Sequence, residues 1–394
     1  MRIAVFELDY HIIQLCNFCK LFEESEHELT VFTTKKFYSR VKNDPITSKW
    51  KWVLKGEEKI SSFIDENLSL INSHDLIFFN TIASGYRTYY KTNFTSYSII
   101  RIHNGHTYLK PFHHLYVPKN FFEFYKCVSY IVREMIPTLD FYYIPKLIDK
   151  IDFVCLNDYY REEYAIDKNL ISVDKIFPCI PFTTCYSMAK ELDPKSSSLS
   201  ISITGAIDER KRDYELVVNA IKKAMPLLQK PVTLCLLGMP VGRYGKKIIM
   251  TLRKLESEKF KMVCFNGFVP QEEFDLNLKG SDLMLAPMII ENQFRIYKEI
   301  YGTSKSSGNI SDMISFGKML AVPSSFHNDT EMEKVIDKYD SVDSLASILV
   351  NYANDRSLLI KRSKALRDFL VTNYSPKKIL ADFENNYQAK IGNK

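Results

Sequence analysis

Short apolar runs alternate with helical patterns along almost the whole chain, and this alternation restricts the fold more than any other feature of the sequence. Runs such as Arg2–Phe6, Glu28–Thr33 and Asp75–Asn80 have the length and apolar content of buried strands. Between the first two, His11–Glu23 carries apolar residues at helical spacing. Strands that alternate with helices form parallel sheets covered by helices on both faces. The sequence therefore predicts an α/β protein.

A hydrophilic segment, Glu191–Ser198, interrupts this alternation before it restarts at the strand-like run Leu199–Thr204. Its polar composition, with proline and serine, is typical of a linker between domains. We therefore predict two Rossmann-like, doubly wound domains over residues 1–190 and 199–375, facing each other across a cleft. Ligands of such sheets bind beyond the carboxyl ends of the strands, so functional residues should directly follow strands.

Length and composition limit the class of protein. With 394 residues, of which 46% are hydrophobic, the chain can form two cores. It begins MRIAVFELDY, which lacks the features of a signal peptide, and no run of about 18 apolar residues occurs. We expect a cytoplasmic protein, at most peripheral at the inner face of a membrane. The net charge of +6 suits an anionic substrate or a membrane surface, but it does not require nucleic acid.

Eight cysteines are spread along the chain. Cys16 and Cys19 form a CxxC inside a helical pattern, but no second ligand pair accompanies them, so core packing is favoured over a redox or zinc role. Buried free thiols are also expected in four strand-like runs, at Cys155, Cys179, Cys235 and Cys264. No Asp-x-Asp follows a strand and no His/Cys set has zinc-ligand spacing, so we predict no metal site.

The first candidate site follows the strand Leu199–Thr204. Gly205 allows a tight turn close to a ligand, and Arg210 and Lys211 can place positive charge beside a phosphate. The alternative is a solvated charged turn without a ligand.

The second candidate site is the loop Gly302–Asp312, which is rich in glycine and serine and leads into a helical run. Unpaired backbone N–H groups at a helix start, together with the helix dipole, bind anions without a metal. The alternative is a surface loop in which Asn309 or Ser311 caps the helix. Neither candidate site contains GxGxxG, which disfavours a dinucleotide-dependent oxidoreductase.

The two candidate sites, in their order along the chain with the strands and helices between them, resemble the donor-binding half of retaining GT-B glycosyltransferases. The resemblance is strongest to the family-4 group, which takes part in bacterial polysaccharide assembly. That group has a Gly-Arg turn with a lysine six residues after the glycine. Gly205 and Lys211 keep this spacing, while Ala206 stands at the arginine position and Arg210 is its possible substitute. The resemblance implies a GT-B fold in which the last helix, over residues 376–390, crosses back to the first domain.

The resemblance also implies roles for individual residues. Backbone near Phe268 and Val269 is expected to receive the nucleobase. Asp312 stands where the family's second glutamate holds the ribose, and Ser304 stands where the first glutamate would be, which departs from the family pattern. A diphosphate is expected on the backbone at the start of the following helix, in the run Ser306, Ser307, Gly308 and Asn309.

These expectations together describe a glycosyltransferase of the hexosyltransferase type. Its donor would be a UDP- or GDP-linked sugar, used as a substrate without any cofactor or metal. Its acceptor would be a glycan or a lipid-linked molecule, and nucleic acid is not an expected partner. Three other readings stay open: a catalytically silent GT-B partner, a GT-B sugar-nucleotide epimerase, and a DNA-modifying glucosyltransferase, which the dispersed basic residues disfavour.

The first domain would bind the acceptor. His11 and His103 both follow predicted strands, and either imidazole can act as a base or hydrogen-bond a sugar hydroxyl. For each, a purely structural role is the alternative.

The segment Phe112–Lys150 combines many aromatic residues with interleaved lysines and an arginine. It could lie on an anionic bilayer, close to a lipid-linked acceptor. Alternatively, its aromatic side chains fill the core of the first domain while the basic residues face solvent, and we favour this second interpretation.

Overall fold

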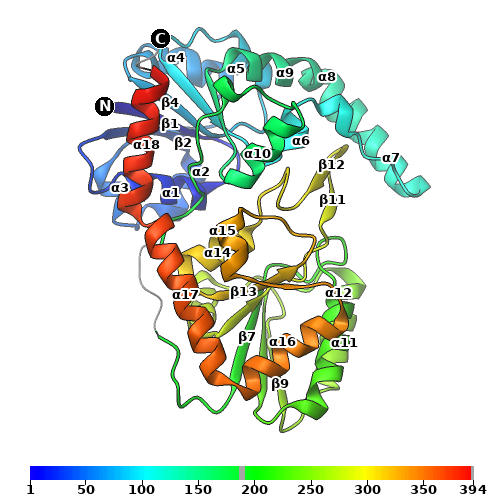
Figure 1. Cartoon of the computed structure of the whole chain (residues 1–394). Helices are drawn as coiled ribbons and strands as arrows, with labels where there is room; N and C mark the ends of the chain where they lie inside the picture. Colours follow the sequence, from blue (N-terminus) through cyan, green and yellow to red (C-terminus); the bar gives the residue numbers. More distant parts are fainter. Residues whose placement is uncertain (186–190, 392–394) are drawn as a thin grey trace. The chain divides into compact units, whose positions relative to one another are not determined.

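The computed structural model describes residues 1–185 and 191–391, with only the backbone considered at position 159. It divides the chain into two compact units. Unit 1 consists of residues 1–184, 293–306 and 376–394, and unit 2 of residues 185–292 and 307–375. Figure 1 shows each unit built on its own sheet. Residues 293–306 thus group with unit 1, although the residues on either side of them belong to unit 2.

Unit 1 is built on a parallel sheet with the strand order β3-β2-β1-β4-β5-β6. The strands are β1 (Arg2–Glu7), β2 (Glu28–Thr34), β3 (Lys51–Lys55), β4 (Leu76–Thr81), β5 (Tyr97–Arg101) and β6 (Phe153–Cys155). All six residues of β4 are buried, as expected for a central strand covered on both faces. This is the doubly wound order found in dinucleotide-binding folds.

Two separate apolar clusters cover the two faces of this sheet. One contains Phe63, Tyr89 and Leu147, and the other contains Leu15, Phe22 and Phe383. The helices of unit 1 are α1 (Ile12–Leu21), α2 (Lys35–Val41), α3 (Ile46–Lys49), α4 (Ile60–Asn72), α5 (Tyr86–Lys91), α6 (Gly105–Tyr108), α7 (Phe121–Tyr130), α8 (Ile136–Thr138), α9 (Asp140–Lys150), α10 (Tyr159–Asp167) and α18 (Pro376–Ile391). Short 3-10 turns, η1 (Pro111–His114) and η3 (Val173–Lys175), and a π-helical turn, η2 (Ile131–Met135), connect them.

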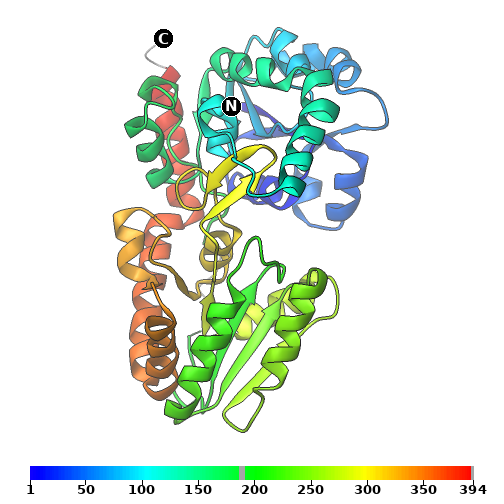
Figure 2. The same ribbon diagram turned by 90° about the vertical axis from the view of Figure 1, so that its right-hand side faces the viewer.

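Unit 2 repeats the same topology with the strand order β14-β13-β10-β7-β8-β9, again all parallel. The strands are β7 (Leu199–Thr204), β8 (Val232–Leu237), β9 (Phe260–Cys264), β10 (Leu283–Leu285), β13 (Met319–Pro323) and β14 (Asp337–Tyr339). The helices are α11 (Tyr214–Ala224), α12 (Gly242–Arg253), α13 (Gln271–Gly280), α14 (Gly308–Phe316), α15 (Thr330–Val335), α16 (Val342–Asn354) and α17 (Arg356–Tyr374), with a 3-10 turn η4 (Met225–Leu227). Figure 2 shows helices on both sides of this sheet. The predicted α/β class with two doubly wound sheets is confirmed.

The segment Phe112–Lys150 divides into two parts that behave differently. Its second part, α9, packs Tyr143, Ile144 and Leu147 into the core of unit 1. Its first part, around α7, is largely exposed, with Phe121 82% and Phe122 64% accessible. The prediction that the aromatic residues fill the core is therefore wrong for the first part of the segment.

All eight cysteines are free thiols. Cys16 and Cys19 are buried in the cluster on α1, which confirms core packing, and burial raises the pKa of Cys16 to about 11. Cys264 is only half-buried, unlike the other three thiols that were predicted to be buried in strands. Within residues 1–185 and 191–391, no helix combines the length and apolar composition needed to cross a bilayer.

Candidate active site

Each sheet reverses its strand order beside its first strand, between β1 and β4 in unit 1 and between β7 and β10 in unit 2. At such a switch point the connections diverge to opposite faces of the sheet and leave a crevice, which is where ligands of open α/β sheets bind. The residues that follow β7 begin at Gly205, and those that follow β10 begin at Ala286. The switch point of unit 2 is therefore the first place to look for a site.

The turn after β7 depends on Gly205, whose φ is +90°. A Cβ at this position would lie 2.3 Å from Nη2 of Arg212. The Arg212 guanidinium donates to the carbonyls of Thr204 at 2.5 Å and Ala206 at 3.2 Å, so it fixes both sides of the turn. Glycine is required here for its backbone angle and for the space that the guanidinium occupies. Sequence reasoning missed Arg212, because only Lys211 kept the family spacing and Arg210 was considered as the substitute for the missing arginine.

Arg210 and Lys211 differ in their surroundings. Arg210 pairs with Asp208, with Nη2 and Oδ2 2.7 Å apart, and its side chain is 70% exposed. Lys211 is held through its backbone, whose carbonyl accepts from Ile289 N at 3.0 Å in the loop after β10. The Lys211 ammonium is exposed and makes no hydrogen bond to any residue that the structure describes. Lys211 therefore places a cation at the switch point, whereas the charge of Arg210 is already partly balanced.

Helix α14 starts beside the same turn. Ser307 caps it, with Oγ accepting from Asn309 N at 3.2 Å, so the cap is neither Asn309 nor Ser311, the residues that the alternative interpretation named. Asn309 Nδ2 donates to Thr204 Oγ1 at 2.7 Å, and Thr204 Oγ1 donates to Asp312 Oδ2 at 2.8 Å. These bonds join the end of β7 to the first turns of α14. Gly308 is exposed, and a Cβ added to it would meet nothing within 4 Å.

Asp312 is half-buried, and burial raises the pKa of its carboxyl to about 6 despite the Thr204 hydrogen bond. It is thus a carboxylate at neutral pH that becomes protonated only slightly below it. Near the start of a helix, such a carboxylate can accept hydrogen bonds from a diol.

Asp312→Asn should weaken the binding of UDP about tenfold, through loss of a charged hydrogen bond. In the wild type the affinity should also fall between about pH 7.5 and about pH 5, as Asp312 takes up its proton, and this part of the pH dependence should be absent in the variant. The variant should be at least as stable as the wild type at neutral pH, because it relieves a buried charge. Calorimetric titration at both pH values measures this. An identical pH dependence in the two proteins would exclude Asp312 from the site.

The other predicted donor residues lie apart from this group. Phe268 is 86% exposed and Val269 is buried; both follow β9, which is separated from β7 by β8. Ser306 belongs to unit 1, where the Arg161 guanidinium contacts its hydroxyl and its N–H points to the His103 carbonyl at 3.5 Å. The predicted loop Gly302–Asp312 is therefore divided between the two units, with residues 302–306 in unit 1 and residues 307–312 in unit 2.

In unit 1 the two predicted histidines lie together. The rings of His11 and His103 stack with centroids 3.9 Å apart, and the His103 ring also stacks with that of Phe182 at 4.9 Å. Nε2 of His103 lies 3.1 Å from both Thr81 Oγ1 and the Asn80 carbonyl oxygen. Burial lowers the pKa of His11 to about 4 and that of His103 well below its usual range. Both imidazoles are therefore neutral at neutral pH and suited to hydrogen bonding.

His11→Gln should make the stability of unit 1 less dependent on pH. Between about pH 6.5 and about pH 4, the unfolded chain protonates His11 while the folded chain does not, so folding loses up to about 1.4 kcal/mol per pH unit on acidification. The variant lacks this contribution, so its unfolding free energy should fall less steeply. Urea unfolding followed by tryptophan fluorescence reports unit 1, because Trp50 and Trp52 both lie there. Equal slopes in the two proteins would show that His11 is not buried as a neutral ring.

The switch point of unit 1 contains charged residues that sequence reasoning missed. Asp9 accepts from Ala83 N at 2.7 Å and from Ser84 Oγ at 2.9 Å, which ties the loop after β1 to the loop after β4. Arg295 donates to the Ala83 carbonyl at 3.0 Å and has a φ of +56°. It lies at the turn between β11 (Glu291–Phe294) and β12 (Tyr297–Ile300). No local motif could reveal this contact, because 212 positions separate Arg295 from Ala83.

Buried Glu299 holds the β12 end of this hairpin in unit 1. Its carboxylate accepts from Thr107 N at 2.9 Å, from Thr107 Oγ1 at 2.7 Å and from Ser304 Oγ at 2.6 Å. Ser304, predicted as a counterpart of a donor-site glutamate, is thus a buried partner of Glu299.

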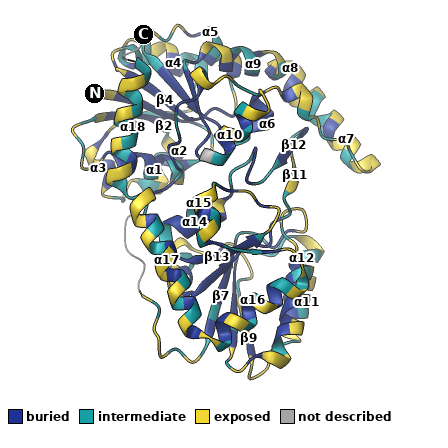
Figure 3. Ribbon diagram, viewed as in Figure 1, coloured by how far each residue is buried: buried dark blue, intermediate teal, exposed yellow. Residues whose placement is uncertain are grey.

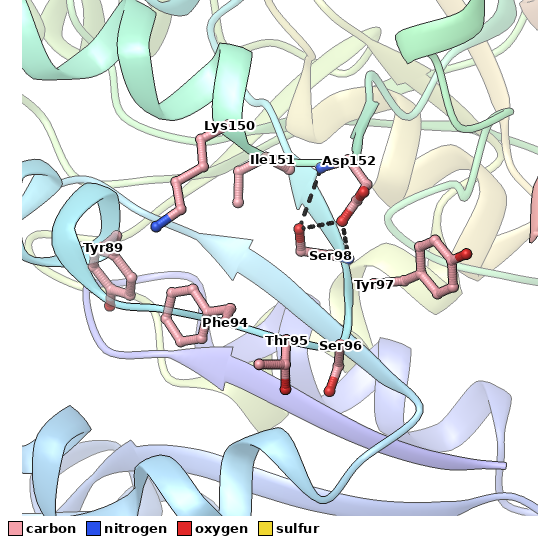
Figure 4. A pocket seen from close by; sticks show the side chains of 9 residues that line it. All are labelled: Tyr89, Phe94, Thr95, Ser96, Tyr97, Ser98, Lys150, Ile151 and Asp152. Atoms are coloured by element: carbon pink, nitrogen blue, oxygen red, sulfur yellow. Dashed lines mark hydrogen bonds between the residues drawn. The ribbon is translucent and has the colours of Figure 1, made fainter. Parts of the chain in front are cut away.

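A pocket of about 370 Å³ lies at the amino ends of the strands in the six-stranded sheet of unit 1, opposite the end that carries its switch point (Figure 4). Residues 94–98, at the amino end of β5, line it together with Lys150 and Asp152. Asp152 accepts from both the N–H and the hydroxyl of Ser98 at 3.0 Å. Its position, away from the carboxyl ends of the strands, separates it from the switch point of unit 1.

No protein-family model and no curated protein matches this sequence. The fold, in contrast, matches solved structures over its full length, and it is the fold of the GT-B glycosyltransferases. HepE from Anabaena has a TM-score of 0.64 at 10% identity, covering 99% of this chain and 100% of HepE. TarM, a protein of S. aureus, has a TM-score of 0.66 at 10% identity, with 98% of each chain covered.

A proposed UDP-N-acetylglucosamine 2-epimerase from Listeria monocytogenes shares the fold as well. Its TM-score is 0.52 at 10% identity, with 100% of this chain and 97% of that chain covered. At such low identity these similarities define the fold alone. The family-4 subgroup therefore remains a resemblance carried by Gly205, Lys211 and Asp312.

Proposed function

We propose that the chain is a glycosyltransferase that moves a hexose from a UDP- or GDP-linked donor to a glycan or lipid-linked acceptor. The observation that carries the proposal is the arrangement at the switch point of unit 2. There a glycine turn, an exposed lysine and a helix start with a nearby carboxylate lie on adjoining elements. These are the features that a nucleoside diphosphate requires: cations and open N–H groups for phosphates, and an acceptor for ribose. The structures of HepE with UDP and of TarM with UDP support this choice of ligand.

In this proposal the diphosphate is bound by Lys211 and by the backbone N–H of Gly308 at the start of α14, since the Asn309 N–H already donates to Ser307 Oγ. Asp312 accepts from the ribose hydroxyls, and the base lies beside Phe268 and Val269. During transfer, the bond from the sugar C1 to the diphosphate oxygen breaks and its electron pair leaves with the diphosphate. The acceptor oxygen bonds to C1, and its proton passes to the departing diphosphate oxygen or to water. Charge develops on the leaving diphosphate, so Lys211 acts where transition-state stabilisation is largest.

Unit 1 is proposed to bind the acceptor at its own switch point. His11 and His103 can hydrogen-bond a sugar hydroxyl there, and Asp9 and Arg295 add charged groups at the same edge. An imidazole whose pKa is about 4, as for His11, is a weak base at neutral pH, so a hydrogen-bonding role is favoured.

We further propose that transfer needs no metal ion and no cofactor, since the lysine and the helix start supply the positive charge. Turnover should therefore continue unchanged in excess EDTA. Loss of activity in EDTA, with recovery on addition of manganese, would contradict this part of the proposal.

The experiment that tests the function is donor turnover. UDP-glucose, UDP-N-acetylglucosamine and GDP-mannose are incubated with the chain, and release of the free nucleotide is measured without added acceptor. Slow release of UDP or GDP is expected, because transferases commonly hydrolyse their donors. The epimerase reading, which the Listeria structure favours, instead predicts a changed sugar that stays attached to the nucleotide. A silent partner would bind the nucleotide and do neither.

A further inference from the structure

An aromatic arm extends from unit 1. We use this name for residues 111–136, which contain η1, α7 and η2. Figure 1 shows α7 reaching outward from the rest of unit 1, and Figure 3 shows its largely exposed surface. Ten apolar side chains of the arm are between 40% and 82% accessible: Phe112, Leu115, Val117, Phe121, Phe122, Phe124, Tyr125, Val128, Val132 and Ile136. So many exposed apolar side chains on one short segment indicate an interaction site.

The arm is held in place along one side. Cys127 and Met135 pack with Ile296 and Tyr297 of the β11–β12 hairpin. The N-terminus of α7 is capped by Asn120, whose side chain accepts from Glu123 N at 2.9 Å. The opposite side carries Phe121, Tyr125 and Val128 at helical spacing, so packing within unit 1 does not account for them. The apolar face is therefore presented by an ordered helix.

The charges of the arm favour an anionic partner. Lys119, Lys126 and Arg133 are all exposed, and the Lys126 ammonium lies 4.1 Å from the centre of the Phe122 ring. Two carboxylates stand against these three cations: Glu134, which is exposed, and Glu123, which accepts from Lys119 N at 2.7 Å and from Tyr116 OH at 3.0 Å. The three cations exceed the two carboxylates, so the arm keeps a small positive net charge.

The pairing of lysine and aromatic ring recurs in α9, at the other end of the same segment. The Lys146 ammonium lies 4.2 Å from the centre of the Tyr142 ring, and Tyr142 is 47% exposed. Aromatic and aliphatic side chains flanked by lysine and arginine are the composition of helices that lie in the interface of anionic bilayers.

We propose that the aromatic arm binds the surface of an anionic lipid bilayer, with the apolar side chains of α7 inserted among the headgroups and the basic side chains contacting lipid phosphates. A bilayer fits better than a second copy of the chain, because two such arms would bring basic residues of like charge together. The proposal does not depend on the glycosyltransferase activity, since it involves only residues outside both switch points.

The test is co-sedimentation of the full chain with vesicles of pure phosphatidylcholine and with vesicles that also contain phosphatidylglycerol. The wild type should bind the anionic vesicles, and binding should weaken as salt is raised. The double variant Phe121→Ser/Tyr125→Ser should bind at least about tenfold more weakly, because two large apolar side chains are removed from the lipid phase. Lys126→Gln/Arg133→Gln should weaken binding to the anionic vesicles by about tenfold or more.

The matched control is Met250→Ser/Leu276→Ser, which removes two similarly exposed apolar side chains from unit 2 and should bind like the wild type. All four exposed positions should tolerate serine, which circular dichroism verifies. The proposal is overturned if the wild type does not bind anionic vesicles, or if the arm variants bind as well as the control. It is also overturned if the arm variants instead abolish a dimer of the wild type seen without lipid.

Discussion

Replacing Lys211 by alanine should lower donor turnover about 100-fold or more while leaving the fold intact. The exposed ammonium makes no hydrogen bond to the described part of the chain, so little folding energy depends on it. Its backbone, however, is fixed next to the loop after β10, at the switch point where the leaving diphosphate is expected. A cation at this position acts mainly on charge that develops during bond breaking, so the effect should fall on kcat more than on donor affinity.

The matched control for this variant is Lys222→Ala. Lys222 is also exposed, but it lies in the last turn of α11. Nucleotide release from the best donor is measured for both variants, together with their thermal unfolding. If Lys211→Ala turned over as fast as Lys222→Ala, the segment around position 211 would be the solvated charged turn that is the alternative reading.

Gly238→Ala should destabilise unit 2 by about 3 kcal/mol or more, the upper end for overpacking a closely packed site. A Cβ at Gly238 would lie 2.1 Å from the carbonyl oxygen and 2.3 Å from the carbonyl carbon of Gly205. These are backbone atoms, so no side chain can move aside to make room. The turn after β7 would have to shift, together with the Gly205 N–H bond to the Leu237 carbonyl. Donor binding should therefore be lost along with stability.

Gly267→Ala is the control for this substitution, because a Cβ there meets nothing within 4 Å. Unfolding is followed by circular dichroism, which reports both units, and by tryptophan fluorescence, which reports unit 1. The dichroism transition of Gly238→Ala should begin at lower temperature. Equal transitions for the two variants would mean that the turns after β7 and β8 are not packed backbone to backbone.

The two sheets could be predicted from the sequence because their evidence is local. Each buried strand is a short apolar run, and each covering helix repeats its apolar residues at helical spacing, as in α1 and α11. The short hairpin β11–β12 has no such signal. Strand β11 is largely exposed, β12 has only four residues, and contacts with unit 1 residues far away in the sequence hold the hairpin. Residues 293–306 were for this reason assigned to the second domain.

The candidate site was predictable only where its geometry is local. Gly205 stands directly after a strand and Asp312 stands one turn into a helix, so the positions of both residues could be predicted from the order of strands and helices. Arg212 does not, because its role arises when its guanidinium folds back onto the carbonyls of Thr204 and Ala206. For the same reason the contact of Ser306 with Arg161 could not be predicted, because Arg161 lies 145 positions earlier in the chain.

The aromatic arm shows a further limit of sequence patterns. Helical spacing of Phe121, Tyr125 and Val128 indicates an apolar face but not what covers that face. Only the packing of Cys127 and its neighbours on the β11–β12 hairpin shows which side of α7 is buried. The exposed side then follows, and it carries more aromatic surface than the buried side.

The central claim, that unit 2 binds a nucleoside diphosphate at the start of α14, is tested most directly by calorimetric titration of UDP and GDP into the wild type and into Gly308→Val. Because a Cβ at Gly308 meets no other atom within 4 Å, the valine variant should fold normally and only crowd the approach of a ligand. The account predicts saturable binding of UDP or GDP to the wild type and strongly weakened binding to the variant. Binding of neither nucleotide to the wild type, or equal affinity in the two proteins, would contradict it.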